Sequence, residues 1–150
     1  MPTIRITINR DTVFDEVSKL TDYIGSKSES EDKDIRDRVL ATNNSLSDLN
    51  RFWSDSILVI NERFKQMVDE YLITGSTFAL SLDVSMSFDV MLAPEVTTAL
   101  TGFIISSITG RWFKITNKAE SAEYMERAAE FLKSAERLLY SRKKPTRPTI

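Results

Sequence analysis

The residue types that most enzymes use for nucleophilic, acid-base or metal chemistry are scarce in this chain. It has 150 residues and contains no His and no Cys, which excludes Ser-His and Cys-His dyads, thiolate nucleophiles, disulfides and the usual zinc ligand sets. Carboxylate or Lys chemistry remains open, but the acids fall mostly on polar helix faces, and no pair of them can be placed together in an apolar pocket. We therefore expect a protein that is not an enzyme and that uses no cofactor.

The densest group of metal-ligating side chains is an acid-rich segment near residue 30. It contains five carboxylates, those of Glu29, Glu31, Asp32, Asp34 and Asp37. Three basic residues are mixed among them, and the Gly on which a calcium-binding loop turns is missing. The composition therefore predicts a solvated loop and no metal site.

A basic tail follows the last predicted helix. Residues 142–150 include two Pro, which will not continue a helix, and four cations without an acid: Arg142, Lys143, Lys144 and Arg147. Cations at a helix end also suit its negative pole, which explains part of the cluster. The functional interpretation is a peptide that docks into an acidic groove on a partner or touches nucleic-acid phosphates. We favour docking, because no aromatic residues are interleaved with these charges.

About four helical segments are predicted from apolar residues that recur at intervals of three or four. Thr12, with Asp15 three residues later, is a candidate N-cap of the first, and Gly25 is its natural end. A long apolar stripe from Ile35 to Tyr71 follows. Residues 31–73 form either one helix or two, since the sequence around residues 43–45 could split the stripe.

The last two helices have clearer starts. Pro94 suits the first position of a helix, and Gly110, inside its apolar face, is either a weak point or a point of close packing. Asn117 with Glu120 forms a capping box for the final helix. The large aromatic residues of the chain lie in phase with the apolar stripes, so we expect them in the core.

Two segments alternate with the period of a strand. Thr3 to Ile8 is short and apolar at every second position. The second, an arm at about residues 76–91, alternates without a fault at Phe78, Leu80, Leu82, Val84, Met86, Phe88 and Val90. The pattern predicts one long strand or β-arm inserted before the third helix.

The long arm can be interpreted in three ways. It could be an ordinary strand, bent in the middle, that covers the helical core, or a hairpin with a turn near Asp83 to Ser85. It could also pair with another subunit, because the only other strand candidate is short and the arm lacks the Lys or Arg that blunts a free edge. On that interpretation the seven apolar residues from Phe78 to Val90 are subunit contacts.

These segments predict a mainly α fold: a helical bundle of about four helices with the inserted arm and a short N-terminal strand. Residues 1–141 form a single domain, and residues 142–150 the tail. Charged residues interrupt the first twenty positions, so we expect no secretion signal. The uncharged stretch from Val96 to Gly110 is shorter than the roughly 20 apolar residues of a spanning helix, so we expect no membrane association.

This layout resembles the head-to-tail connector, or adaptor, proteins in the neck of tailed bacteriophages. The likeness lies in the order of elements: a helical bundle without catalytic residues, a β-arm between its middle helices, and a basic Pro-containing tail. It implies a structural virion protein, assembled in the host cytoplasm as a homo-oligomeric ring. The arm would contact neighbouring ring components, and Arg142 to Ile150 would reach onto the portal or other neck and tail proteins. DNA would pass through the ring without being read by base-specific residues.

An alternative class stays open. A small regulatory or inhibitory helical protein, such as an immunity or antitoxin-like protein, would also be acidic and lack His and Cys. It would be a monomer or dimer that binds one protein target.

Overall fold

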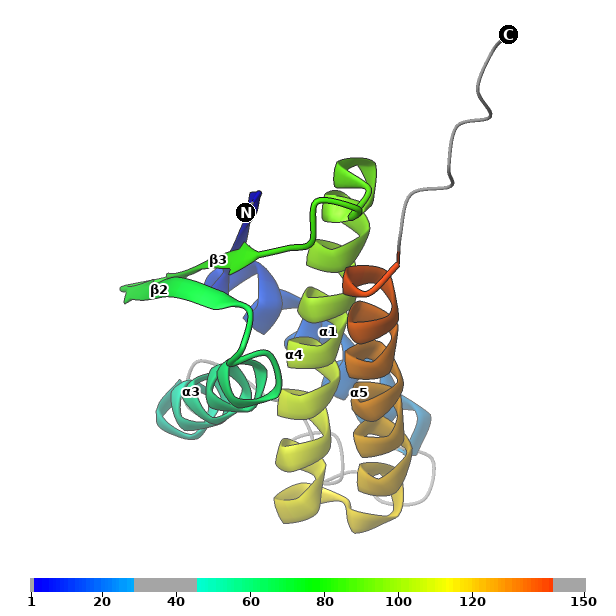
Figure 1. The fold of residues 1–150 in the computed structure, drawn as a ribbon. Coiled ribbons are helices and arrows are strands. Elements are labelled where there is room, and N and C mark those ends of the chain that lie inside the picture. Colours follow the sequence, from blue (N-terminus) through cyan, green and yellow to red (C-terminus); the bar gives the residue numbers. More distant parts are fainter. Residues whose placement is uncertain (1, 29–45, 142–150) are drawn as a thin grey trace, which may run out of the picture.

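The computed structural model describes residues 2–28 and 46–141 and is mainly helical, as predicted (Figure 1). In these residues, helices α1 (Arg10–Ser28), α3 (Leu46–Arg63), α4 (Ala93–Thr116) and α5 (Lys118–Leu139) accompany an antiparallel sheet of three short strands. The strands are β1 (Thr3–Asn9), β2 (Val68–Thr74) and β3 (Thr77–Asp83). Figure 1 shows α4 in the middle of the molecule, with α5 alongside it and α3 and the sheet on its other side.

The N-terminal strand is confirmed, and the start of α1 differs from the prediction. In β1, Ile4, Ile6 and Ile8 are buried and the residues between them are exposed. The side-chain Oδ1 of Asn9 accepts a hydrogen bond of 3.0 Å from the backbone N–H of Thr12. Asn9 therefore caps the helix, three residues before the predicted cap, and the helix continues past Gly25 to Ser28.

The predicted helical stripe ends early, at Arg63. The backbone N–H groups of Met67 and Val68 both donate to the carbonyl of Phe64, so the chain turns there and enters β2. Met67 and Tyr71 are four residues apart, an interval that fits a helix face and equally one face of a strand. The β-branched and aromatic residues of β2 favour the strand. Gly75 has a φ of 49° and supplies the first central residue of a two-residue hairpin turn.

The prediction of one long strand over residues 76–91 is wrong. Strand β3 ends at Asp83 and lies in the centre of the sheet, in the order β1-β3-β2. Beyond it, Ser85 Oγ accepts from the N–H of Ser87, and the Asp89 carboxylate accepts from the N–H of Met91. These local bonds turn the backbone, as Ser and Asp commonly do. Since β3 pairs with a strand on each side within the chain, it does not need another subunit to complete it.

Helix α4 is the centre of the core. It contacts α1, α3, α5 and β1, and five consecutive residues, Ser106 to Gly110, are buried. Within the described residues, the helical stretch Val90–Thr116 is the one long and apolar enough, by length and composition alone, to cross a membrane. A helix surrounded by others in a core has the same composition, because all its faces are buried.

Helix α5 approaches α4 closely at two glycines. A Cβ built on Gly110 would lie 2.7 Å from Sδ of Met125 and 3.2 Å from its backbone N. The Ser121 hydroxyl donates to the carbonyl of Gly110 at 2.9 Å. Gly110 is therefore a point of close packing. Asn117 does precede α5 as predicted, but its side chain makes no capping hydrogen bond.

This packing predicts different effects for two matched substitutions. Gly110→Ala should destabilise the fold by about 1–3 kcal/mol, because the new methyl group presses on the backbone of α5. At Gly102 the three atoms nearest to the new methyl all belong to the ring of Phe131, which is partly exposed and can swing outward. Gly102→Ala should therefore stay within about 1 kcal/mol of the wild type, since Ala also favours helix. Thermal and urea denaturation would measure both. Equal losses would contradict close packing at Gly110.

Candidate functional site

Most of the predicted subunit-contact side chains belong to the core of the chain itself. Five of the seven are at most 2% exposed: Phe78, Leu80, Leu82, Val84 and Phe88. In this fold they cannot contact a neighbouring subunit. Met86 and Val90 remain on the surface, 83% and 54% exposed, and Met91 beside them is 78% exposed. The exposed part of the predicted contact surface is therefore the Met86–Met91 segment, between β3 and α4.

The Met86–Met91 segment has a defined backbone. The N–H of Phe88 donates to the carbonyl of Ser85, and the N–H of Leu92 donates to the carbonyl of Asp89. Phe88 points into the core and anchors the segment. Because the turns are held by hydrogen bonds on both sides of this anchor, the two methionines are presented outward on a fixed support. Flexible, polarisable Met side chains are common at binding surfaces that adapt to a partner.

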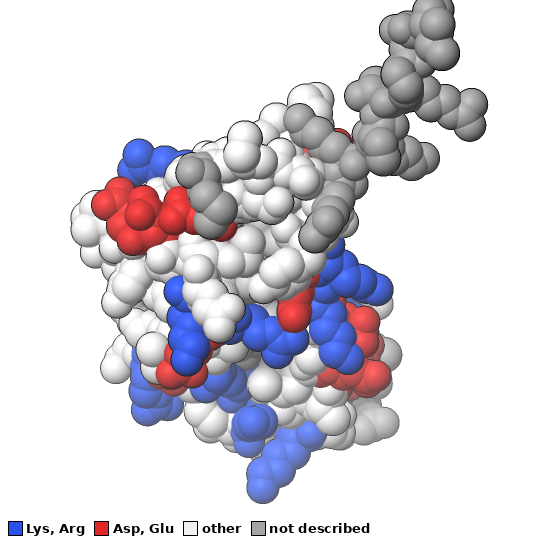
Figure 2. All heavy atoms as spheres, viewed as in Figure 1, with Lys and Arg blue, Asp and Glu red and all other residues white. Residues whose placement is uncertain are grey.

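Charge is distributed unevenly over the face seen in Figure 2. Acidic and basic side chains are interleaved over the lower half and gather again at the sheet. The upper end, where the connection from β3 to α4 lies in Figure 1, is mostly uncharged. Uncharged, partly apolar surface next to an ordered loop favours contact with protein rather than with phosphates.

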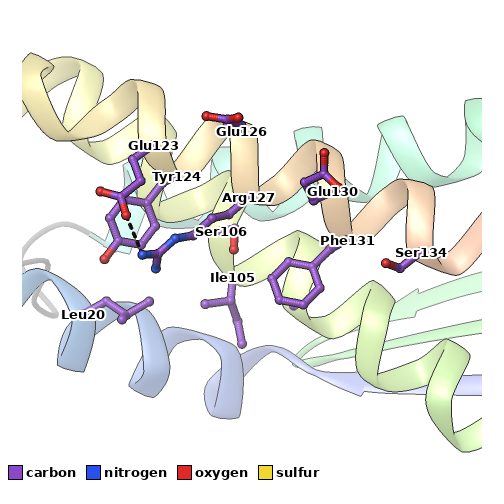
Figure 3. Close-up of a pocket in the computed structure, with 11 residues that line it drawn as sticks. Leu20, Ile105, Ser106, Glu123, Tyr124, Glu126, Arg127, Glu130, Phe131 and Ser134 are labelled. Carbon is purple, nitrogen blue, oxygen red and sulfur yellow. Dashed lines mark hydrogen bonds and ion pairs between the residues drawn. The ribbon is translucent and has the colours of Figure 1, made fainter.

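A groove of about 750 Å³ lies between α1, α4 and α5 (Figure 3). Leu20, Ile105 and Phe131 give it apolar walls, while Glu123, Glu126 and Glu130 of α5 lie along its rim. Arg127 pairs with Glu123 across one helical turn. Such partly exposed pairs contribute only about 0.3–0.5 kcal/mol.

The groove has no reactive group that its geometry activates. The guanidinium of Arg127 lies 4.8 Å from the centre of the Tyr124 ring. Burial raises the pKa of the Tyr124 phenol above its ordinary value, and the Arg127 cation opposes this shift. The phenol is therefore protonated at pH 7 and cannot serve as a base or nucleophile. The groove could hold a ligand, and its phenol is not activated as a base.

The buried polar residues between α3 and α4 hold these helices together. The hydroxyls of Ser56 and Ser107 lie 3.0 Å apart. Arg111 donates to Ser107 Oγ at 3.3 Å and lies 3.5 Å from Asp55. Each hydroxyl thus has the other as its partner. Ser107 also contacts the Arg111 guanidinium, which does not accept a proton. This is a structural cluster rather than a nucleophile with its base.

Strand β2 provides a second surface that sequence reasoning missed. It is an edge strand, and Tyr71, Leu72 and Ile73 are 54%, 57% and 45% exposed. The sequence signal was there, as three apolar residues just before the Gly75-Ser76 turn, but the helical interpretation of the stripe concealed it.

Three sequence predictions concern residues outside the described ranges. They are the acid-rich segment from Glu29 to Asp37, the possible split of the stripe at residues 43–45 into two helices, and the basic tail with Arg142, Lys143, Lys144 and Arg147. Within residues 2–28 and 46–141, no group of three or more acidic side chains is arranged to hold a metal ion. Comparison of the chain with known proteins gave no match to a family model, to a curated protein or to a solved structure.

The contrast between Val84 and Met86 predicts opposite effects of the same substitution. Val84 is fully buried and Met86 is 83% exposed. Val84→Lys should destabilise the fold on the order of 3 kcal/mol or more, because it places a charge in the core. Met86→Lys should change the free energy of unfolding by less than about 0.5 kcal/mol. Urea denaturation followed by circular dichroism would measure both, and a well-folded Val84→Lys variant would contradict the burial of this residue.

Proposed function

We propose that the chain is a structural subunit that acts by protein contact, as a ring-forming head-to-tail adaptor of a tailed-bacteriophage virion. In this proposal the ring docks on the portal and joins it to the tail, and the basic residues Arg142, Lys143, Lys144 and Arg147 carry the docking. The observation that supports it best is the exposed Met86–Met91 segment, held on hydrogen-bonded turns at a mostly uncharged end of the molecule, with Asp89 as the one charged side chain of the segment.

The chemistry of the described residues supports a binding role over catalysis. The whole chain lacks His and Cys, and the groove beside α5 contains a protonated phenol and a guanidinium already paired with a carboxylate. Large exposed apolar side chains on an ordered loop are costly in water unless they are covered for part of the protein's life. A ring contact would cover them.

A second function is favoured by a different observation. Strand β3 is paired on both sides within one chain. The argument that an unpaired arm needs another subunit therefore no longer applies. A sheet that is complete around β3, with exposed apolar side chains on the Met86–Met91 segment, equally suits a small regulatory or inhibitory protein that binds one target. The two functions differ in the stoichiometry that they require.

Mass photometry and native mass spectrometry of the purified chain, over a range of concentrations, would distinguish them. The adaptor proposal expects a closed ring of many copies. The double variant Met86→Lys/Met91→Lys should lose the ring while keeping the circular dichroism spectrum of the folded chain, because both side chains are exposed. The control variant Tyr23→Lys/Ile115→Lys makes the same charge change at positions that are 67% and 61% exposed on α1 and α4, and it should keep the ring.

A wild-type chain that forms no closed ring at any concentration would overturn the adaptor proposal and leave the single-target binding protein. A ring that survives in the Met86→Lys/Met91→Lys variant would instead overturn the assignment of the ring contact to the Met86–Met91 segment.

A further inference from the structure

We propose that the outer edge of β2 pairs with β2 of a second copy, so that two three-stranded sheets join into one continuous antiparallel sheet. The starting observation is that β2 is nearly unburied: six of its seven residues are exposed. In the described residues, β3 is the strand that pairs with β2. The opposite edge carries backbone groups that pair with no described strand.

The hydrogen-bonding pattern identifies which groups point outward. The N–H of Val84 donates to Pro2 and the N–H of Arg10 donates to Ser76, so the even-numbered residues of β3 bond toward β1. The N–H of Asp83 donates to Met67, so the odd-numbered residues bond toward β2. Ala79 is odd and faces Leu72, whereas Phe78 and Leu80 are even and face Ile73 and Tyr71. The N–H and C=O groups of Tyr71 and Ile73 therefore point to the open edge.

This spacing limits how two copies of β2 can pair about a two-fold axis. The outward groups of one strand must meet those of the other, so Tyr71 and Ile73 can pair only with each other or with their own equivalents. Centring the axis on Tyr71 would place Ile73 opposite Asp69 and Leu72 opposite Glu70. Centring it on Ile73 would place Tyr71 opposite Gly75, in the turn.

The remaining register centres the axis on Leu72 and matches the strands well. Tyr71 of each copy then faces Ile73 of the other, an aromatic and β-branched pair of the kind that stabilises sheets. The two Leu72 side chains face each other. Glu70 lies opposite Thr74, so no acid faces another acid. Each Tyr71 to Ile73 pair exchanges two hydrogen bonds, and together they satisfy all the outward groups of both residues.

The chemistry of the edge also favours this occupant. Natural edge strands are commonly blunted by Lys or Pro, and β2 contains neither. Its irregularity between Val68 and Glu70, together with two acids, lies at one end, which leaves Tyr71 to Thr74 regular and uncharged. With the axis at Leu72, Tyr71 and Ile73 of both copies project from the same face of the joined sheet as Phe78 and Leu80. Each copy therefore extends the apolar face of the other.

This pairing is independent of the proposed ring. A two-fold pairing is complete with two copies, whereas a ring needs a head-to-tail contact. The Met86–Met91 segment is the surface assigned to the ring, and the β2 edge is the surface assigned to the pair. Variants at one surface should leave the other contact intact, so the two proposals can fail separately.

Leu72→Lys is the direct test, with Leu58→Lys as its control. Both side chains are about equally exposed, 57% and 56%, and Leu58 lies on α3. Leu72→Lys would place two cations opposite each other on the axis and should abolish the two-copy species in analytical ultracentrifugation. Leu58→Lys should keep it. Both should keep the circular dichroism spectrum of the wild type, and Leu58→Lys should also keep its melting temperature, whereas Leu72→Lys loses the part of the stability that pairing contributes. If a ring forms, the same comparison is made in the Met86→Lys/Met91→Lys background.

A cross-linking experiment tests the register itself. The chain contains no Cys, so a single introduced thiol can form a disulfide only between copies. Leu72 of each copy would form a pair without backbone hydrogen bonds, in which the Cα atoms are close enough for a disulfide. Under mild oxidation, Leu72→Cys should cross-link about tenfold faster or more than Leu58→Cys, because pairing raises the effective concentration of the thiols.

The possible outcomes separate clearly. Loss of the pair in Leu72→Lys but not in Leu58→Lys, with fast cross-linking of Leu72→Cys, supports the pairing. A wild-type chain with no two-copy contact at tens of micromolar or above overturns it, as does a pair that survives Leu72→Lys. Equal cross-linking rates at residues 72 and 58 would also overturn it.

Discussion

The whole fold depends on the burial of the middle of α4, where five consecutive residues, Ser106 to Gly110, are covered on every side of the helix. A helix that is apolar all round is stable in water only when other elements cover it. Here α1, α3, α5 and β1 each contact it. The tightest of these contacts requires the absence of a side chain at Gly110, where α5 comes close enough for the Ser121 hydroxyl to reach the backbone carbonyl. The other helices can keep charged outer faces because α4 supplies the apolar surface against which they pack.

The sequence predicted the elements whose hydrophobic period has one interpretation. The alternating residues of β1, the helical stripe of α4, and the core positions of Trp53 and Phe113 are confirmed. Helix α5 forms as predicted, but the first half of its buried face differs: Tyr124 and Ala128 are buried, whereas Ala122 and Ala129, which the spacing placed on that face, are exposed. It failed where an interval fits two structures. The four residues between Met67 and Tyr71 fit a helix or a strand. The alternation from Val84 to Val90 also fits a strand, but the side chains of Ser85 and Asp89 accept hydrogen bonds from backbone N–H groups and turn the chain there.

The candidate surfaces were less predictable than the core, for a physical reason. Hydrophobic residues in a periodic pattern indicate a buried face, but the sequence does not indicate whether the residues that bury it belong to the same chain. Val84 and Met86 occupied equivalent places in the alternating pattern, yet one is buried and the other exposed. Tyr71 and Ile73 share a sheet face with buried neighbours in β3 and remain exposed because they lie beyond the elements that cover it. Tertiary packing separates these residues, and periodicity alone cannot.

The pairing of β1 with β3 also affects the order in which the molecule can fold. Ile8 is made well before its partner in the sheet, Phe78. The ladder that joins them therefore closes a loop of most of the chain that precedes α4. Contacts of such long sequence separation form slowly, because the entropy of closing the loop is lost before the contact stabilises it. During synthesis on a ribosome, the apolar side of β1 would stay exposed to water until the hairpin of β2 and β3 had emerged.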